Sequence, residues 1–72
     1  MRIEYNPKYD LLNIEFISDE AIVESMELDG IIIDYSEARN IVAIEVLDAG
    51  KRTTKNQLDL LDLTIVKEKA IA

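Results

Sequence analysis

The sequence predicts an α+β domain that is mostly β: an antiparallel five-stranded meander followed by a short C-terminal helix, and then either more helix or a final short strand. Short segments that alternate polar with apolar side chains are separated by turn residues, which is the pattern of β-strands. The loops between them are short, and short loops join antiparallel neighbours. A helix-start signature occurs only near the C-terminal end. Seventy-two residues predict one small domain over residues 1–72.

The first two strands are expected to form a hairpin, and the third is expected at a sheet edge. Residues 2–5 and 11–16 alternate polar with apolar side chains, and the segment between them contains the only proline. Residues 22–28 form a third strand, whose Glu24 and Glu27 suit an edge. The apolar side chains of the hairpin are expected on one face: Ile3, Tyr5, Leu12, Ile14 and Phe16.

The fourth and fifth strands, residues 31–35 and 41–47, are the most apolar part of the chain. An Asp-Gly pair predicts a tight turn before the fourth strand, and Asn40 is expected in the left-handed conformation in the turn after it. Apolar side chains alternate onto both faces of these strands, so each face needs a cover.

This need for cover, in so short a chain, predicts a homodimer. A chain of this size buries only roughly 60% of its unfolded surface, and without Cys or His it lacks disulfides and the common zinc sites. Alternation divides the central apolar residues into two sets, and it leaves open which set faces a partner. The set assigned to the interface is Ile32, Val42, Ile44 and Val46. The set assigned to the core is Ile31, Ile33, Ile41 and Leu47.

The chain changes character after Gly50, where a short basic segment precedes a predicted helix over residues 55–61. Thr54 and Gln57 fit the capping box that begins such a helix. An apolar stripe on the helix is expected to cover one face of the sheet. Residues 63–66 are rich in β-branched side chains, so they are predicted either to continue the helix or to form a final short strand.

The charge of the chain limits its partners. Fifteen acidic and eight basic residues give a formal net charge of −7 at pH 7. Such a charge repels nucleic acids and anionic membranes, and no apolar run approaches the length of a membrane span. The N-terminal residues lack the apolar segment of a signal peptide. We therefore expect a cytoplasmic protein that binds neither nucleic acid nor membrane.

Histidine and cysteine are absent, which excludes Ser-His and Cys-His nucleophiles. We expect no catalytic residues and no cofactor. The candidate metal ligands are carboxylates near the central hairpin that could gather at one edge around a hard cation: Asp29, Asp34, Glu45 and Asp48. The alternative interpretation is that Asp29 and Asp48 bond the backbone of their own turns. Asp34 is expected to face solvent near a strand end; if it is buried, it needs a partner such as Arg39.

Four blocks of the sequence resemble a known family. The blocks, which keep their order along the chain, are residues 1–7, 10–14, 29–35 and 44–49. They are similar to the short prokaryotic proteins catalogued as domain of unknown function 2283, over about residues 1–50. The chain departs from the family pattern at Asn6, Asn40 and Ala43, where the family usually has Asp, Gly and Gly.

The resemblance implies a small, mostly β domain with no assigned activity. It also implies an antitoxin role, because members of this family are thought to be encoded beside small ribonuclease-type proteins, and an acidic chain suits a basic partner. Our first hypothesis is a non-catalytic interaction protein, a small β-rich homodimer that is an antitoxin-like partner of such a basic protein. The alternative is a carboxylate-based protein or enzyme that binds a divalent metal.

Overall fold

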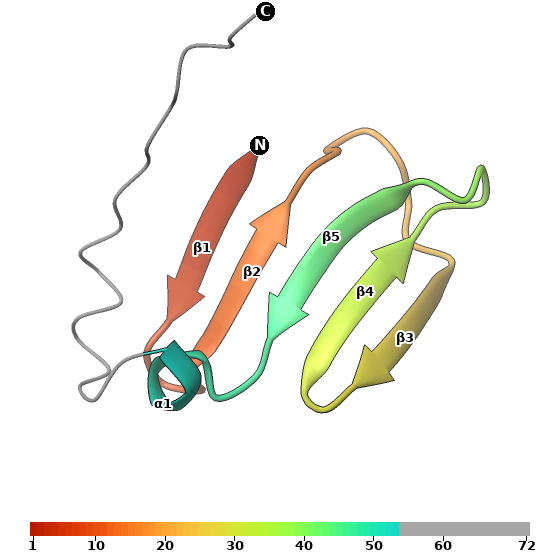
Figure 1. Cartoon of the computed structure of the whole chain (residues 1–72). Coiled ribbons are helices and arrows are strands. Elements are labelled where there is room, and N and C mark those ends of the chain that lie inside the picture. Colours follow the sequence, from red (N-terminus) through yellow and green to blue (C-terminus); the bar gives the residue numbers. More distant parts are fainter. Residues whose placement is uncertain (54–72) are drawn as a thin grey trace, which may run out of the picture.

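The computed structural model describes residues 1–53 of the 72-residue chain, and these form a five-stranded antiparallel sheet followed by a short helix (Figure 1). The prediction of a mostly β domain with five antiparallel strands is therefore confirmed. The elements are β1 (Arg2–Asn6), β2 (Leu11–Glu15), β3 (Glu24–Leu28), β4 (Ile31–Tyr35), β5 (Ile41–Val46) and α1 (Ala49–Thr53).

The strands are arranged in the order β1-β2-β5-β4-β3, so one connection differs from a plain meander. Residues 16–23 carry the chain from β2 to the far edge of the sheet, and β5 later fills the place between β2 and β4 (Figure 1). The start of this connection is fastened to β5, because the backbone N–H groups of Phe16 and Ile17 donate to the Val42 carbonyl at 2.7 and 3.2 Å. The central position suits β5, whose Val42 and Ala43 are the most buried apolar strand residues.

The predicted pairings at both ends of the sheet are present. In the first hairpin, Ile3 lies opposite Ile14 and Tyr5 lies opposite Leu12, so these apolar side chains share one face. The third strand is shorter than predicted, because it begins at Glu24, but it does lie at the edge of the sheet. All five of its residues are exposed, as expected of a strand with a neighbour on one side only.

The turn between β3 and β4 has the predicted form, whereas the turn between β4 and β5 differs. Asp29 and Gly30 both have positive φ, 52° and 79°, which is typical of the two-residue turns that match strand twist. In the second turn the left-handed residue is Arg39, with φ 68°, and the expectation for Asn40 was wrong. Asn40 instead forms two hydrogen bonds with Ser36. Its carbonyl accepts from the Ser36 N–H at 2.9 Å, and its own N–H donates to the Ser36 hydroxyl.

Helix α1 begins at Ala49, before the predicted helix. A contact distant in sequence starts it: the N–H groups of Ala49 and Gly50 donate to the carbonyl and the carboxylate of Asp10, at 2.9 and 2.8 Å. This contact holds α1 at the end of the sheet that carries the β1–β2 turn (Figure 1). The predicted helix over residues 55–61, its capping pair and the alternative at residues 63–66 lie outside the described residues.

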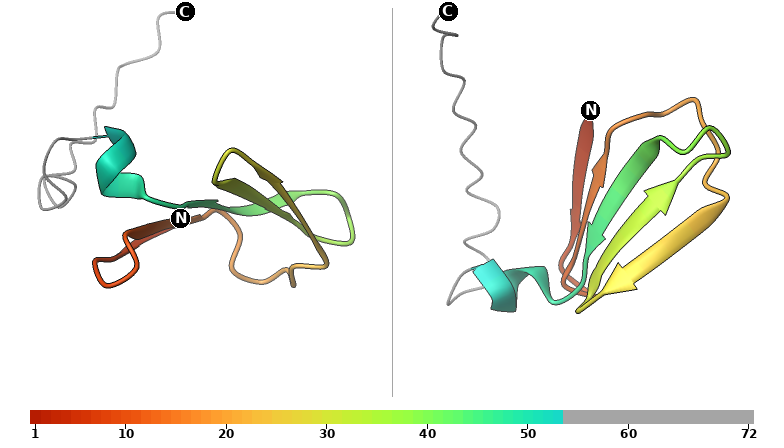
Figure 2. Two further views of the ribbon diagram at one scale, coloured as in Figure 1. Left: turned by 90° about the horizontal axis from the view of Figure 1, so that it is seen from below. Right: turned by 45° about the vertical axis from the view of Figure 1, so that its right-hand side comes forward.

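The sheet is a single layer, with α1 standing to one side of it (Figure 2). Among the described residues, only three apolar ones are buried, Val42, Ala43 and Ala49, and no large side chain is fully buried. A sheet normally buries at least one face against another layer. The described part of the chain therefore carries a core that is open on one side.

Candidate functional site

One face of the sheet is apolar almost from edge to edge. Directly paired residues of antiparallel strands project to the same face, and Ile31 pairs with Val46 while Ile33 pairs with Ile44. Leu12 and Ile14 of β2 lie opposite the same two β5 residues, which extends the face toward β1. We define this apolar face by Ile3, Tyr5, Leu12, Ile14, Met26, Leu28, Ile31, Ile33, Val42, Ile44 and Val46.

The predicted grouping of the central residues was wrong, because it joined the two strands in the wrong register. Ile32 pairs with Glu45 and therefore lies on the opposite face from Val42, Ile44 and Val46. Likewise, Ile31 and Ile33 belong with Ile44 and Val46, and not with Leu47, whereas Ile41 is paired with Tyr35 beyond a shift in register next to Asp34. The two-residue turn, the β5 register and this shift determine how the strands combine.

The expectation of two apolar faces was also wrong. Strand β5 contributes Ala43 and Glu45 to the second face, where Asn13 of β2 pairs with Glu45. We call this second face the polar face. Only the apolar face therefore requires a cover.

Much of the apolar face is exposed in the described part of the protein. Leu28 is 80% exposed, Met26 60% and Ile3 37%, and these residues lie on the outer strands. The central residues are half-buried, and only Val42 is fully covered. A continuous apolar patch of this kind is typical of an interaction surface.

The polar face contains a buried acid. Asp34 is only 2% exposed, so the expectation that it faces solvent was wrong. The Ser25 hydroxyl, on the neighbouring edge strand, donates to Asp34 Oδ1 at 2.6 Å. Arg39, the partner considered from the sequence, instead pairs with Glu24 at 2.5 Å. The second oxygen, Asp34 Oδ2, is also buried. No N–H or hydroxyl group of the described residues donates a hydrogen bond to it.

Glu45 completes this site. Its hydrogen bond with Asp34, its partial burial and the negative charge of Asp34 together raise the pKa of Glu45 to about 7. The protonated Glu45 carboxyl can donate to Asp34, which gives the buried acid a second partner. Below about pH 7, Glu45 therefore keeps its proton, an arrangement that depends on two acids being diagonal neighbours on β4 and β5.

The four candidate metal ligands do not gather. Asp34 and Glu45 lie on the polar face, whereas Asp29 and Asp48 lie at turns near α1, within 4 Å of cationic side chains. Asp48 is 3.8 Å from Lys51, and Asp29 is 3.9 Å from Arg52. Residues 1–53 contain no group of three or more side chains suited to holding a metal ion. The expectation that these carboxylates meet at one edge was therefore wrong.

Asp10 is an anchoring residue that the sequence did not single out. It is buried, and its Oδ1 accepts from the Tyr5 hydroxyl at 2.7 Å and from the Gly50 N–H at 2.8 Å. The Tyr5 hydrogen bond, followed by backbone donors of α1, lowers the pKa of Asp10. Its φ of 51° also closes the β1–β2 turn. The local signal was only that of a turn aspartate, because the backbone donor Gly50 lies 40 residues further along the chain.

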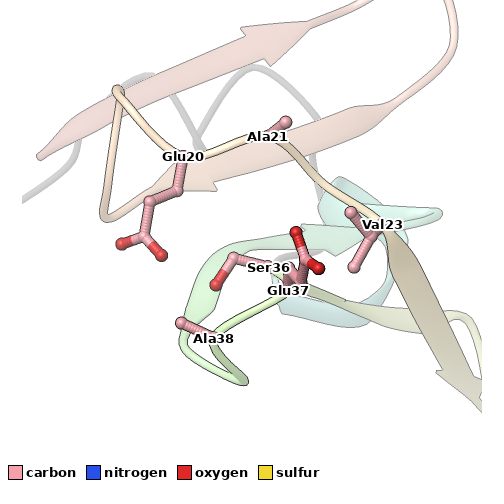
Figure 3. A pocket seen from close by; sticks show the side chains of 6 residues that line it. All are labelled: Glu20, Ala21, Val23, Ser36, Glu37 and Ala38. Carbon is pink, nitrogen blue, oxygen red and sulfur yellow. The ribbon is translucent and has the colours of Figure 1, made fainter.

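A hollow of about 420 Å³ lies between the long connection and the β4–β5 turn (Figure 3). Its lining residues are Glu20, Ala21, Val23, Ser36, Glu37 and Ala38. The Glu20 carboxylate accepts from the Asn40 side chain, and the Ser36 hydroxyl accepts from the Asn40 N–H. The carboxylates of Glu20 and Glu37 do not converge in this view (Figure 3). The Glu20 carboxylate and the Ser36 hydroxyl thus hold the two loops together through Asn40.

The fold and site define a small antiparallel β domain with one open apolar face and one polar face. The profile of a family described as "Protein of unknown function (DUF2283)" matches residues 2–49, a range that covers the whole sheet. The chain belongs to this family, as the sequence resemblance predicted. Comparison with curated proteins and with solved structures found no match. In the described part of the chain, no helix has the length and apolar character needed to cross a membrane.

Proposed function

We propose that this protein acts by binding other proteins and not by catalysis, as a homodimer in which the apolar faces of two copies pack together. The open apolar face is the observation that carries this proposal. The central part of this face carries no charged side chain, so it matches a second copy of itself, and two such sheets would form a sandwich about 10 Å thick; Glu24, opposite Tyr35, lies at the outer margin of the face. The core of the protein would then be completed by association.

The size of the face is adequate for a dimer. Five strands about 4.8 Å apart, each about five residues long at roughly 3.3 Å per residue, give roughly 400 Å² in projection on each copy. Side chains make the accessible area larger than the projection. Two copies would thus bury an area toward the lower end of the roughly 1,200–2,000 Å² of specific interfaces.

The charge supports a second, basic partner. The chain carries 15 acidic against 8 basic residues, and complementary fields speed the encounter of oppositely charged proteins. We propose an antitoxin-like role toward a small basic ribonuclease-type protein, by analogy with the setting of the family. The metal-binding alternative receives less support, because its four candidate ligands are divided between the polar face of the sheet and the turns near α1.

Light scattering on the full chain tests the dimer. We expect the mass of two chains at micromolar concentration, and we expect Ile44→Asp to shift the mass toward one chain. This substitution places a charge at the centre of the apolar face, where a dimer would bury it unpaired. Ile3→Asp, on the outer strand and 37% exposed, is a milder variant in case the central one fails to fold.

Asn13→Asp is the matched control, because it adds the same charge on the polar face of β2. It should leave the dimer mass unchanged. Circular dichroism should show that each compared variant retains its sheet. A wild-type protein with the mass of one chain contradicts the proposed dimer, as do apolar-face variants that remain folded dimers.

A further inference from the structure

Within residues 1–53, the edge strand β3 has backbone groups with no neighbouring strand. The hydrogen bond from the Leu47 N–H to the Gly30 carbonyl, 2.9 Å long, fixes the ladder between β4 and β5. By the alternation of antiparallel ladders, Ile31 and Ile33 then bond across to β3, at Leu28 and Met26. Ser25 and Glu27 therefore direct their backbone N–H and C=O groups away from the sheet, toward its open edge.

The two sides of this edge have different chemistry. On the apolar face, a groove of about 400 Å³ runs along the strand. It is lined by Met26, Glu27, Leu28, Ile31 and Ile33. On the polar face, the exposed Glu27 side chain follows the edge and forms no ion pair within residues 1–53.

The charge along the edge selects the partner. Glu24, Glu27 and Asp29 are the acids of β3 and its turn; Glu24 pairs with Arg39 and Asp29 lies 3.9 Å from Arg52, which leaves Glu27 as the unpaired negative charge of this edge within residues 1–53. A second copy of β3 would bring these acids together, and acidic edges of this kind prevent sheets from pairing with their own kind. At the opposite edge, Arg2 and Glu4 neutralise one another at 2.7 Å. A basic strand is therefore favoured at β3.

We propose that β3 binds an extended segment of a basic partner protein, which adds to the sheet as a sixth strand. Its basic side chains would lie on the polar face beside Glu27, and its alternate apolar side chains would enter the groove beside Met26 and Leu28. Two residues that are paired by hydrogen bonds across antiparallel strands project their side chains to the same face of the sheet. The amides that bond to Ser25 and Glu27 therefore belong to the basic residues of the partner strand.

This inference rests on the proposed interaction function and names the surface and the chemistry of the partner. The groove residues Met26, Leu28, Ile31 and Ile33 also belong to the apolar face, so a second copy that leaves room for the added strand would pack mainly on β1, β2 and β5.

The test uses a fluorescein-labelled, capped heptapeptide that alternates lysine with valine, and measures its binding to the full chain by fluorescence anisotropy. Methylating the lysine backbone amides removes the donors that face β3 and should weaken binding by roughly tenfold or more. Methylating the valine amides alters only donors that face solvent, and it should have little effect. A peptide that alternates glutamate with valine should not bind.

Two protein variants test the same edge. Glu27→Pro removes an outward N–H without removing a bond to β4, so it should weaken binding by roughly tenfold. Glu27→Gln, which removes only the charge, should have a smaller effect. Glu4→Gln, the control on the opposite edge, should have none.

The inference is overturned if the lysine–valine peptide does not bind, or if the two methylated peptides bind equally well. It is also overturned if Glu27→Pro converts a dimer to single chains, because β3 would then pair with a second copy. Light scattering on the same samples distinguishes a failure of the edge inference from a failure of the dimer proposal. A protein that is a dimer but does not bind the peptide contradicts only the edge inference.

Discussion

Glu45 and Asp34 form the most unusual pair of side chains in the sheet. A carboxyl with a pKa near 7 beside a buried carboxylate resembles the coupled acids of some active sites, but here the third partner is only the Ser25 hydroxyl. The pair lies where β3, β4 and β5 are side by side. Its simplest role is to hold these three strands in register at neutral and acidic pH.

The pair predicts a stability that depends on pH. The folded pKa of Glu45 is raised from 4.5 to about 7, so between these values the unfolded chain loses a proton that the folded protein keeps. The free energy of unfolding should therefore fall as pH rises from about 4.5 to about 7, and then level off. Because Glu45 is partly solvated, we expect a change on the order of 1 kcal/mol.

Glu45→Gln should remove this decrease, since the glutamine amide can donate to Asp34 without carrying charge. Urea unfolding between pH 4 and pH 8 measures the effect. Glu15→Gln, also a charge removal on the polar face, should retain the wild-type profile. A glutamine variant at position 45 with an unchanged pH profile would show that the two acids are not coupled.

At the scale of elements, Arg52 fastens α1 to the β3–β4 turn. Its guanidinium donates to the carbonyls of Leu47 and Asp29, and it lies directly over Gly30. Gly30 thus meets two requirements: it supplies a positive φ of 79°, and it leaves room for the arginine. The sequence indicated the first of these through the Asp-Gly pair, but the second depends on a residue far along the chain.

Gly30→Ala should lower the free energy of unfolding by roughly 1–2 kcal/mol, because alanine is strained at this φ and its Cβ would collide with Arg52. Thermal or urea unfolding measures the loss. The double variant with Arg52→Ala should recover the part that comes from the collision, in a double-mutant cycle. If the two substitutions are simply additive, the arginine is not what makes this position restrictive.

At the scale of the whole molecule, the sequence predicted the five strands and the polar edge from local patterns alone. It could not predict that β5 lies between β2 and β4. The residues of the connection, 16–23, do not indicate whether the next strand lies beside β2 or at the far edge of the sheet. The error in the interface set has the same origin: Ile32 and Ile44 were grouped by alternation, and only the register separates them. Asp10 and the Asp34–Glu45 pair likewise depend on contacts between distant segments.

The open face predicts that stability depends on protein concentration. If the sheet is completed by a second copy, raising the concentration about a hundredfold should increase the melting temperature by several degrees, because association favours the folded state. Differential scanning calorimetry over that range measures this shift. Asn13→Asp should show the same dependence as the wild type. A melting temperature that does not change would mean that each chain is stable alone.

The position of β5 also constrains the time at which the protein can fold. β1 with β2, and β3 with β4, are hairpins of neighbouring segments, and an isolated hairpin is only marginally stable in water. The two hairpins share no ladder until β5 enters between them. During synthesis, the emerging chain therefore has two separate weak hairpins until Val46 has left the ribosome. The strand that joins them is the last of the five described strands to be made, so this sheet forms in one late step.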